Sequence, residues 1–255
     1  METIIPKSST ALASLLRADF TTLVRNRRSV VLALLVPNII LVSWKGLVKH
    51  TGGPFVLATA VVIGLMAIGL MGYSITIARD RDKGIFQRLR VAPLPTWTIM
   101  VSRIMVQLFM IILLTLVVFI VGYQFDGILL SVSGYVLTFF VAFIGGAVYL
   151  SLGQLIVGLI KNPETVNATT RLVYFLFIMT GMFGDLSQFN DMGKLGPYLT
   201  WMAHWSPYGC VKIMTAASME PTKWGHDNNM ALLLSIGYTI VFAAIGIKNF
   251  KWESR

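Results

Sequence analysis

The chain has 255 residues, of which 56% are hydrophobic and only 13% are charged, about half the charged share of a typical soluble domain. This composition excludes an ordinary soluble protein and indicates an integral membrane protein. The formal net charge of +10 would suggest a nucleic-acid partner in a soluble chain, but here the basic residues lie mostly at the ends of apolar runs, where they indicate topology and contacts with lipid headgroups.

The N-terminal part predicts a helix in the membrane interface, followed by the first of six spans. Over residues 10–26 the apolar residues recur at helical spacing, but Arg17 and Asp19 interrupt them. Such a helix is too polar to cross the bilayer and suits the interface plane. The first span is predicted at 30–48 and the second at 55–78.

A loop at 79–95 carries the longest run of charges in the chain. Its positive excess places it on the cytoplasmic side. Ile85, Phe86 and Leu89 fall on one side of a short amphipathic helix, which Pro93 ends. Two interpretations follow: a loop that rests on lipid headgroups, or a helix that docks on a cytoplasmic partner.

The remaining spans are predicted at 99–123, 134–160, 172–188 and 230–247, and an outside loop with two short helices is predicted at 189–228. Sixteen of the 21 Lys and Arg residues fall in segments assigned to one side, and five fall in segments assigned to the other. This bias predicts that both termini are cytoplasmic. The expected fold is therefore an all-α integral membrane protein with six transmembrane helices.

Few side chains suggest chemistry at membrane depth. All eleven acidic residues fall in predicted loops or termini, which disfavours an ion-coupled secondary transporter. His50, His204 and His226 are isolated, and Cys210 is the only cysteine, so we predict no metal site and no intrachain disulfide. No G-x-x-x-x-G pair is followed by Lys, so the chain carries no phosphate-binding loop of that kind and no catalytic site is predicted.

Three short motifs add to this layout. The second span is followed by Arg79-Asp80-Arg81-Asp82-Lys83-Gly84 and then by Gln87-Arg88-Leu89-Arg90-Val91-Ala92-Pro93. Thr180-Gly181 lies in the fifth span, and Trp205-Ser206-Pro207-Tyr208 precedes the last short outside helix. With the six-span layout, these motifs resemble the permease subunits of type 2 ATP-binding cassette exporters of the drug or lipid type. The family more often has Glu at the positions of Asp80 and Asp82, and it often has prolines soon after the fifth-span glycine, where this chain has none.

The resemblance implies an exporter of two permeases, expected to be a homodimer, and two separate ATPase subunits that hold ATP and Mg²⁺, so no cofactor is expected in this chain. It implies a cell-membrane location in contact with lipid. The charged loop would dock on the ATPase. The residues implied in this coupling are Asp80, Asp82, Gly84, Ile85, Phe86, Leu89, Arg90 and Pro93.

Spans two and five would line the transport route. Methionine and aromatic side chains adapt to varied hydrophobic ligands, so we expect a drug-like or lipid-like substrate. The candidate lining residues are Met66, Met71, Tyr73, Tyr174, Phe177, Thr180 and Phe183. Export of a polysaccharide or glycolipid, and a membrane anchor or sensor subunit that transports nothing, are the alternatives.

Overall fold

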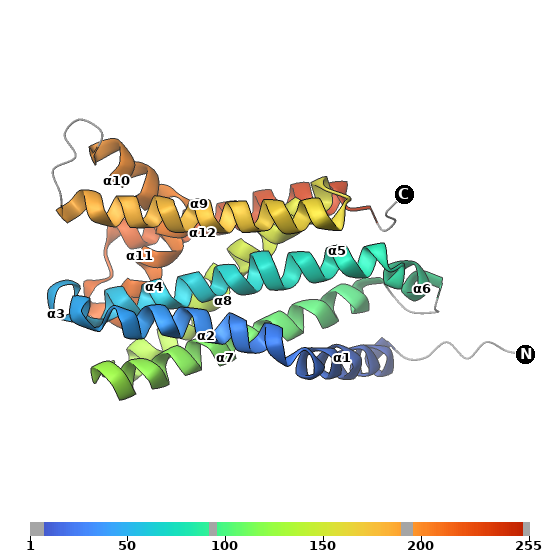
Figure 1. Ribbon diagram of the computed structural model, residues 1–255, viewed down its shortest axis with the longest axis horizontal. Helices are drawn as coiled ribbons and strands as arrows, with labels where there is room; N and C mark the ends of the chain where they lie inside the picture. The colour runs from blue at the N-terminus through green and yellow to red at the C-terminus, as the bar shows by residue number, and fades with distance from the viewer. Residues whose placement is uncertain (1–7, 92–95, 190–195, 252–255) are drawn as a thin grey trace, which may run out of the picture.

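The computed structural model describes residues 8–91, 96–189 and 196–251, and these segments form a bundle of helices without strands (Figure 1). The α-helices are α1 (Ser8–Arg25), α2 (Arg27–Ser43), α3 (Val48–Thr51), α4 (Gly53–Met66), α5 (Ile75–Asp82), α6 (Ile85–Val91), α7 (Thr96–Asp126), α8 (Val132–Leu159), α9 (Pro163–Phe189), α10 (Gly196–Trp205), α11 (Pro207–Met219) and α12 (His226–Asn249). Between them lie the 3₁₀ turns η1 (Lys45–Leu47) and η4 (Pro221–Lys223) and the π-helix η2 (Ala67–Ser74).

Five helical segments are long and apolar enough to cross a membrane. They are Gly53–Asp82, Trp97–Asp126, Val132–Leu159, Pro163–Gly184 and His226–Asn249. Helices α1 and α2 meet at a bend of 59° and supply a sixth crossing if the bent pair is counted as one span. The prediction of an all-α integral membrane protein is therefore confirmed.

The first crossing differs in detail from the predicted range of 30–48. Helix α2 ends at Ser43, and the chain continues through η1 into the short α3. Gly46 lies inside the 3₁₀ turn, and glycine lowers the stability of a continued α-helix. The 17 residues of α2 span about 25 Å, so the turns after it complete the distance across a bilayer core of about 30 Å.

Helix α9 begins nine residues before the predicted start of the fifth span at 172. Asn162 caps it, because its Oδ1 accepts hydrogen bonds from the backbone N–H groups of Glu164 at 2.8 Å and Thr165 at 3.4 Å. Pro163 takes the first helical position, where its missing N–H costs nothing. Residues 163–171, which fall between the predicted spans 134–160 and 172–188, therefore form the first turns of a helix.

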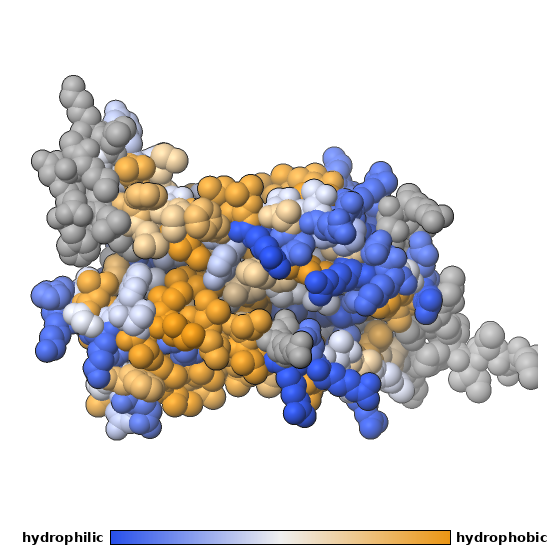
Figure 2. Space-filling model, viewed as in Figure 1, coloured by the Kyte–Doolittle hydropathy of each residue, from blue (hydrophilic) through white to orange (hydrophobic). Residues whose placement is uncertain are grey.

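The bundle has a polar end that carries α1, α5, α6 and the C-terminal end of α12 (Figure 1). Figure 2 shows apolar side chains in a broad band over the middle of the molecule and many hydrophilic ones toward this end. Helices α3 and α10 lie at the opposite end (Figure 1). The N-terminal end of α1 and the C-terminal end of α12 thus lie at the same end of the bundle, as expected for an even number of crossings.

Helix α11 lies deeper than the short outside helix expected from the sequence. Its N-terminus is capped by Ser206, whose Oγ accepts a hydrogen bond from the Gly209 N–H at 3.1 Å. The helix contacts α4, α8 and α12, and its Ser218 Oγ donates to Thr138 Oγ1 of α8 at 3.0 Å. Buried hydroxyls on α11 have partners within the bundle, so the helix packs as part of the core.

The π-helix η2 crosses α8 at very close range. A methyl group placed on Gly153 of α8 would lie 2.5 Å from Ser74 Oγ and 2.6 Å from the Gly69 carbonyl oxygen of η2. Ser74 Oγ donates to the same Gly69 carbonyl at 3.2 Å. The two helices therefore need a glycine at this crossing.

We expect Gly153→Val to destabilise the protein by about 2 kcal/mol, because the helices must separate to admit the side chain. The measurement is the midpoint of heat-induced loss of the monodisperse peak in detergent. Gly237→Val on α12 is the matched control, since nothing lies within 4 Å of a methyl group at that position. Equal midpoints for the two variants would contradict the close crossing.

Candidate coupling site and hydrophobic groove

The charged stretch forms an elbow, defined here as residues 79–91, in which α5 turns into α6. Gly84 makes the turn with φ of +66°, a conformation that glycine adopts without strain. Its N–H donates to the Arg81 carbonyl at 3.0 Å, which closes the end of α5. The short helix predicted within the loop is present as α6 (Ile85–Val91).

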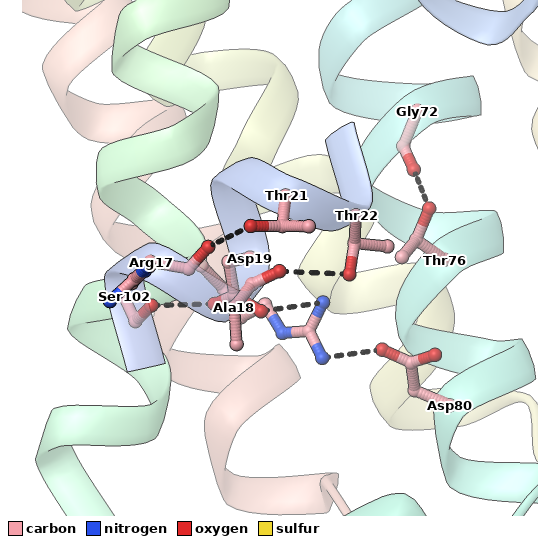
Figure 3. A network of polar contacts seen from close by, with 10 residues as sticks. Arg17, Ala18, Asp19, Thr21, Thr22, Gly72, Thr76, Asp80 and Ser102 are labelled. Carbon is pink, nitrogen blue, oxygen red and sulfur yellow. Dashed lines mark hydrogen bonds and ion pairs between the residues drawn. The ribbon is translucent and has the colours of Figure 1, made fainter. Parts of the chain in front are cut away.

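One side of the elbow is held by a network of charges at the polar end of the bundle (Figure 3). Arg103 of α7 places Nη2 2.6 Å from Asp80 Oδ2 and Nη1 3.4 Å from Asp19 Oδ1. Ser102 Oγ donates to the other oxygen of Asp19 at 2.5 Å. The side chains of the three charged residues are only 13–15% exposed. The network therefore ties α1, α5 and α7 together.

The next residue, Arg81, points to a different helix. Its guanidinium donates from Nη1 to the Val157 carbonyl at 2.8 Å, and from Nη2 to the carbonyls of Ile160 at 2.7 Å and Lys161 at 2.8 Å. These carbonyls lie at the C-terminal end of α8, where a helix has unpaired acceptors and a partial negative charge. Arg81 is 1% exposed, so this buried cation caps α8.

Helix α6 rests on the end of the last span. Phe86 is fully buried and packs edge-on against Phe250, with ring centroids 6.1 Å apart. The Arg81 guanidinium lies 5.8 Å from the centroid of the same Phe250 ring. Leu89 is half-buried against the core. Phe86, expected from the sequence to face a partner, instead anchors α6 to its own chain.

The remaining predicted coupling residues have different surroundings. Asp82 is exposed, as are Gln87 and Arg88, whereas Ile85 is half-buried. Arg90 lies in α6, but its side chain is outside the described residues, as is the whole of Pro93. Among the side chains of α6 that the structure describes, Gln87 and Arg88 are the exposed ones, and both are polar.

A groove of about 400 Å³ lies beside the elbow. It is formed by side chains of α7, α8 and α12 together with Tyr73 of η2. The residues that line it are Tyr73, Met100, Ile104, Leu108, Ala147, Leu150, Ser151, Gln154, Ala243, Ile247 and Phe250. Tyr73 Oη donates to Gln154 Oε1 at 2.8 Å, and both side chains are buried. Phe250 thus belongs both to the groove and to the contact with α6.

The family model described as ABC-2 type transporter matches residues 10–212, about four fifths of the chain. The chain belongs to this family. It is therefore an ABC transporter permease, a component of transport rather than a catalyst, and its family implies an ABC ATPase partner. No match to a curated protein was found.

Toward the other end of the bundle, the permease brings two of its sequence motifs into contact. Gly181 of α9 packs against Tyr208 of α11, since a methyl group on Gly181 would lie 2.7 Å from Tyr208 Cζ. They line a cavity of about 230 Å³. Lys212 of α11 lines it too, with Nζ 3.9 Å from the centroid of the Phe55 ring, a cation–π contact. The glycine is required here by the ring of Tyr208.

Cys210, two residues after Tyr208, is buried in α11. Burial raises the pKa of its thiol to about 11. At neutral pH the group is therefore a protonated thiol, which reacts slowly with alkylating reagents. Cys210 acts as a small apolar side chain in the packing of α11.

The candidate lining residues of the transport route lie on the second and fifth spans, and η2 and α5 of the second span contact α9 of the fifth. Met66 is fully buried in the core and Met71 is half-buried. Tyr73 faces the groove with Gln154. On α9, Tyr174, Phe177 and Thr180 are half-buried and Phe183 is 47% exposed. Their role in a transport route stays a prediction.

Several residues of the elbow and the groove were not predicted from the sequence. The sequence analysis assigned no site role to Asp19, Arg103 or Phe250. It assigned none to Gln154 either, although Gln154 lies within the predicted fourth span. A polar side chain within an apolar span is a signal for a functional or packing contact, and Gln154 carried that signal.

Proposed function

We propose that the chain is the permease subunit of an ATP-driven exporter that moves a hydrophobic drug-like or lipid-like substrate out of the cytoplasm or the inner leaflet. A separate ATPase subunit supplies the energy, and two copies of the permease form the transport unit. The polar end of the bundle, with both chain termini, faces the cytoplasm of a cell membrane. Lys and Arg are concentrated in the segments at this end, in agreement with the positive-inside rule.

The observation that carries the proposal is the way the elbow is held. In the α5 part of the elbow, Asp80 pairs with α7 and Arg81 donates to α8, and in the α6 part Phe86 packs against Phe250 at the end of α12. The elbow as a whole is therefore connected to three spans, as a mechanical link between an ATPase and a transport route requires. A loop that only rested on headgroups would have no need of these contacts.

The lining of the groove supports the substrate class. Methionine, leucine, isoleucine and phenylalanine side chains form most of it, and none of its residues is charged. A polysaccharide would need many hydrogen-bonding groups along its path. If purified complexes were stimulated by a glycolipid and not by hydrophobic compounds, that alternative would replace the one proposed here.

The exposed surface of α6 provides a direct test of coupling. We expect Arg88→Glu to weaken binding of the ATPase subunit about tenfold, because it reverses a charge at the proposed interface. Arg88 is exposed, so folding is expected to be unaffected. The measurement is the amount of ATPase subunit that co-purifies with the tagged permease in mild detergent.

Arg17→Glu on α1 is the matched control, because Arg17 is also an exposed basic residue toward the polar end of the bundle but lies outside the elbow. Wild-type permease and this control should retain equal amounts of ATPase. Full retention by Arg88→Glu would show that α6 does not contact the ATPase through this face. A purified permease dimer without any ATPase subunit would favour the anchor or sensor alternative.

A further inference from the structure

The groove between α7, α8 and α12 opens toward lipid. Ile104 and Ile247 stand in its lining and are 44% and 67% exposed. Both belong to helices that are long and apolar enough to cross the membrane. A mouth bordered by exposed isoleucines on two spans faces hydrocarbon, so a molecule dissolved in the bilayer can enter without passing through water.

Three polar side chains, those of Tyr73, Ser151 and Gln154, lie in the otherwise apolar lining of the groove. Gln154 uses its Oε1 to accept the Tyr73 hydroxyl, which leaves the Nε2 group as a donor. Within the part of the chain that the structure describes, this Nε2 group makes no hydrogen bond. Ser151 donates its hydroxyl to the Val148 carbonyl at 2.8 Å, one turn away. Gln154 is only 9% exposed and lines the groove, so a donor on its side chain favours a ligand that brings an acceptor.

The lining also limits the charge and the size of the ligand. A charged molecule would lose its hydration in this groove and find no opposite charge among the lining residues, so binding of an ion is unfavourable. The volume of about 400 Å³ lies within the range of small-molecule sites. The groove therefore fits a compact, uncharged molecule.

We propose that this groove is a binding site for uncharged hydrophobic molecules that carry a hydrogen-bond acceptor and enter from the bilayer. Phe250 connects the site to the elbow, because the same ring lines the groove and packs against Phe86. A ligand that moves the Phe250 ring would therefore also move Phe86 and α6. Its use as a loading site for export rests on the proposed function, whereas binding itself does not.

Binding is tested with benzophenone, an uncharged ketone that forms covalent adducts with nearby C–H groups on illumination. The purified full-length permease in nanodiscs is illuminated with increasing benzophenone, and adducts are mapped by mass spectrometry. We expect saturable adducts at Met100 of α7 and Leu150 of α8, both of which line the groove. Adducts that rise in proportion to the benzophenone concentration, without saturation, would overturn the proposal.

Two neighbouring alanines of α12 give a matched pair of variants. Ala243 lines the groove, whereas Ala244 is exposed on the same helix and is absent from the lining. Ala243→Phe should lower saturable labelling at least fivefold, and Ala244→Phe should leave it unchanged. If Ala243→Phe does not fold, Ala147→Leu fills the groove from α8 instead. Undiminished labelling in a folded variant with a filled groove would contradict the site.

Competing molecules test the role of Gln154. Fluorenone and fluorene have nearly the same shape, but only fluorenone has a carbonyl acceptor. At equal concentrations in the membrane, fluorenone should displace benzophenone at least threefold better. Equal competition would contradict the assigned ligand class.

Hydrolysis of ATP by the complete complex separates the site from the proposed function. Stimulation by benzophenone in wild-type complexes, and its loss in Ala243→Phe, is expected if the site loads the exporter. Saturable binding without stimulation would confirm the site and contradict the proposed export of hydrophobic substrates.

Discussion

Replacing Arg81 with alanine is expected to lower the stability of the permease by about 3 kcal/mol. The substitution removes three hydrogen bonds that a side chain only 1% exposed donates. A hydrogen bond to a charged group contributes about 1.5–3 kcal/mol. The expected loss is smaller than the sum of three such bonds because the freed carbonyls can accept from other donors. It also removes a cation from the C-terminal end of α8. The heat-induced loss of the monodisperse peak in detergent measures the effect.

Arg79→Ala is the matched control for this prediction. Arg79 lies two residues away on α5, carries the same charge and is exposed. Arg81→Lys should fall between the two alanine variants, because an ammonium keeps the charge but lacks the planar fork that reaches several carbonyls at once. If Arg81→Ala were as stable as Arg79→Ala, capping of α8 by Arg81 would contribute nothing to folding.

The all-helical type of the fold could be predicted because long apolar runs have few alternatives in a bilayer. Spans separated by charged segments predicted an all-α membrane protein, and the structure confirms it. The bounds were harder to predict. Asn162-Pro163-Glu164 is a strong start signal for α9, but these residues lie outside the predicted spans because they are polar.

The contacts of the elbow could not be predicted from the local pattern. Phe86 lies on the apolar face of α6, as the spacing indicated, but spacing does not tell whether that face meets a partner or the same chain. Its neighbour Phe250 is 164 positions away in the sequence. In the same way, nothing in the sequence pairs Asp80 with Arg103 rather than with Arg79 or Lys83, which are nearer in the chain.

The charge network predicts unequal coupling between Arg103 and its two carboxylates. We expect a double-mutant cycle of Arg103→Met with Asp80→Asn to give a coupling energy of about 2 kcal/mol, because the ion pair is 2.6 Å long and mostly buried. The cycle of Arg103→Met with Asp19→Asn should give about 0.5 kcal/mol, since that pair is 3.4 Å apart and Ser102 already binds Asp19. Thermal stability in detergent measures both cycles.

The single variant Arg103→Met is expected to be the least stable member of either cycle, because it leaves Asp19 and Asp80 close together without the cation between them. Adding Asp80→Asn should recover most of the loss by removing one of the two negative charges. Arg103→Met should also weaken the attachment of α1, because Asp19 of α1 contacts α7 through Arg103 and Ser102. Limited proteolysis should then cleave α1 faster in Arg103→Met than in the wild type. Equal coupling energies for the two carboxylates would show that Arg103 holds α1 and α5 alike, and the elbow would then move together with α1 as well as with α7.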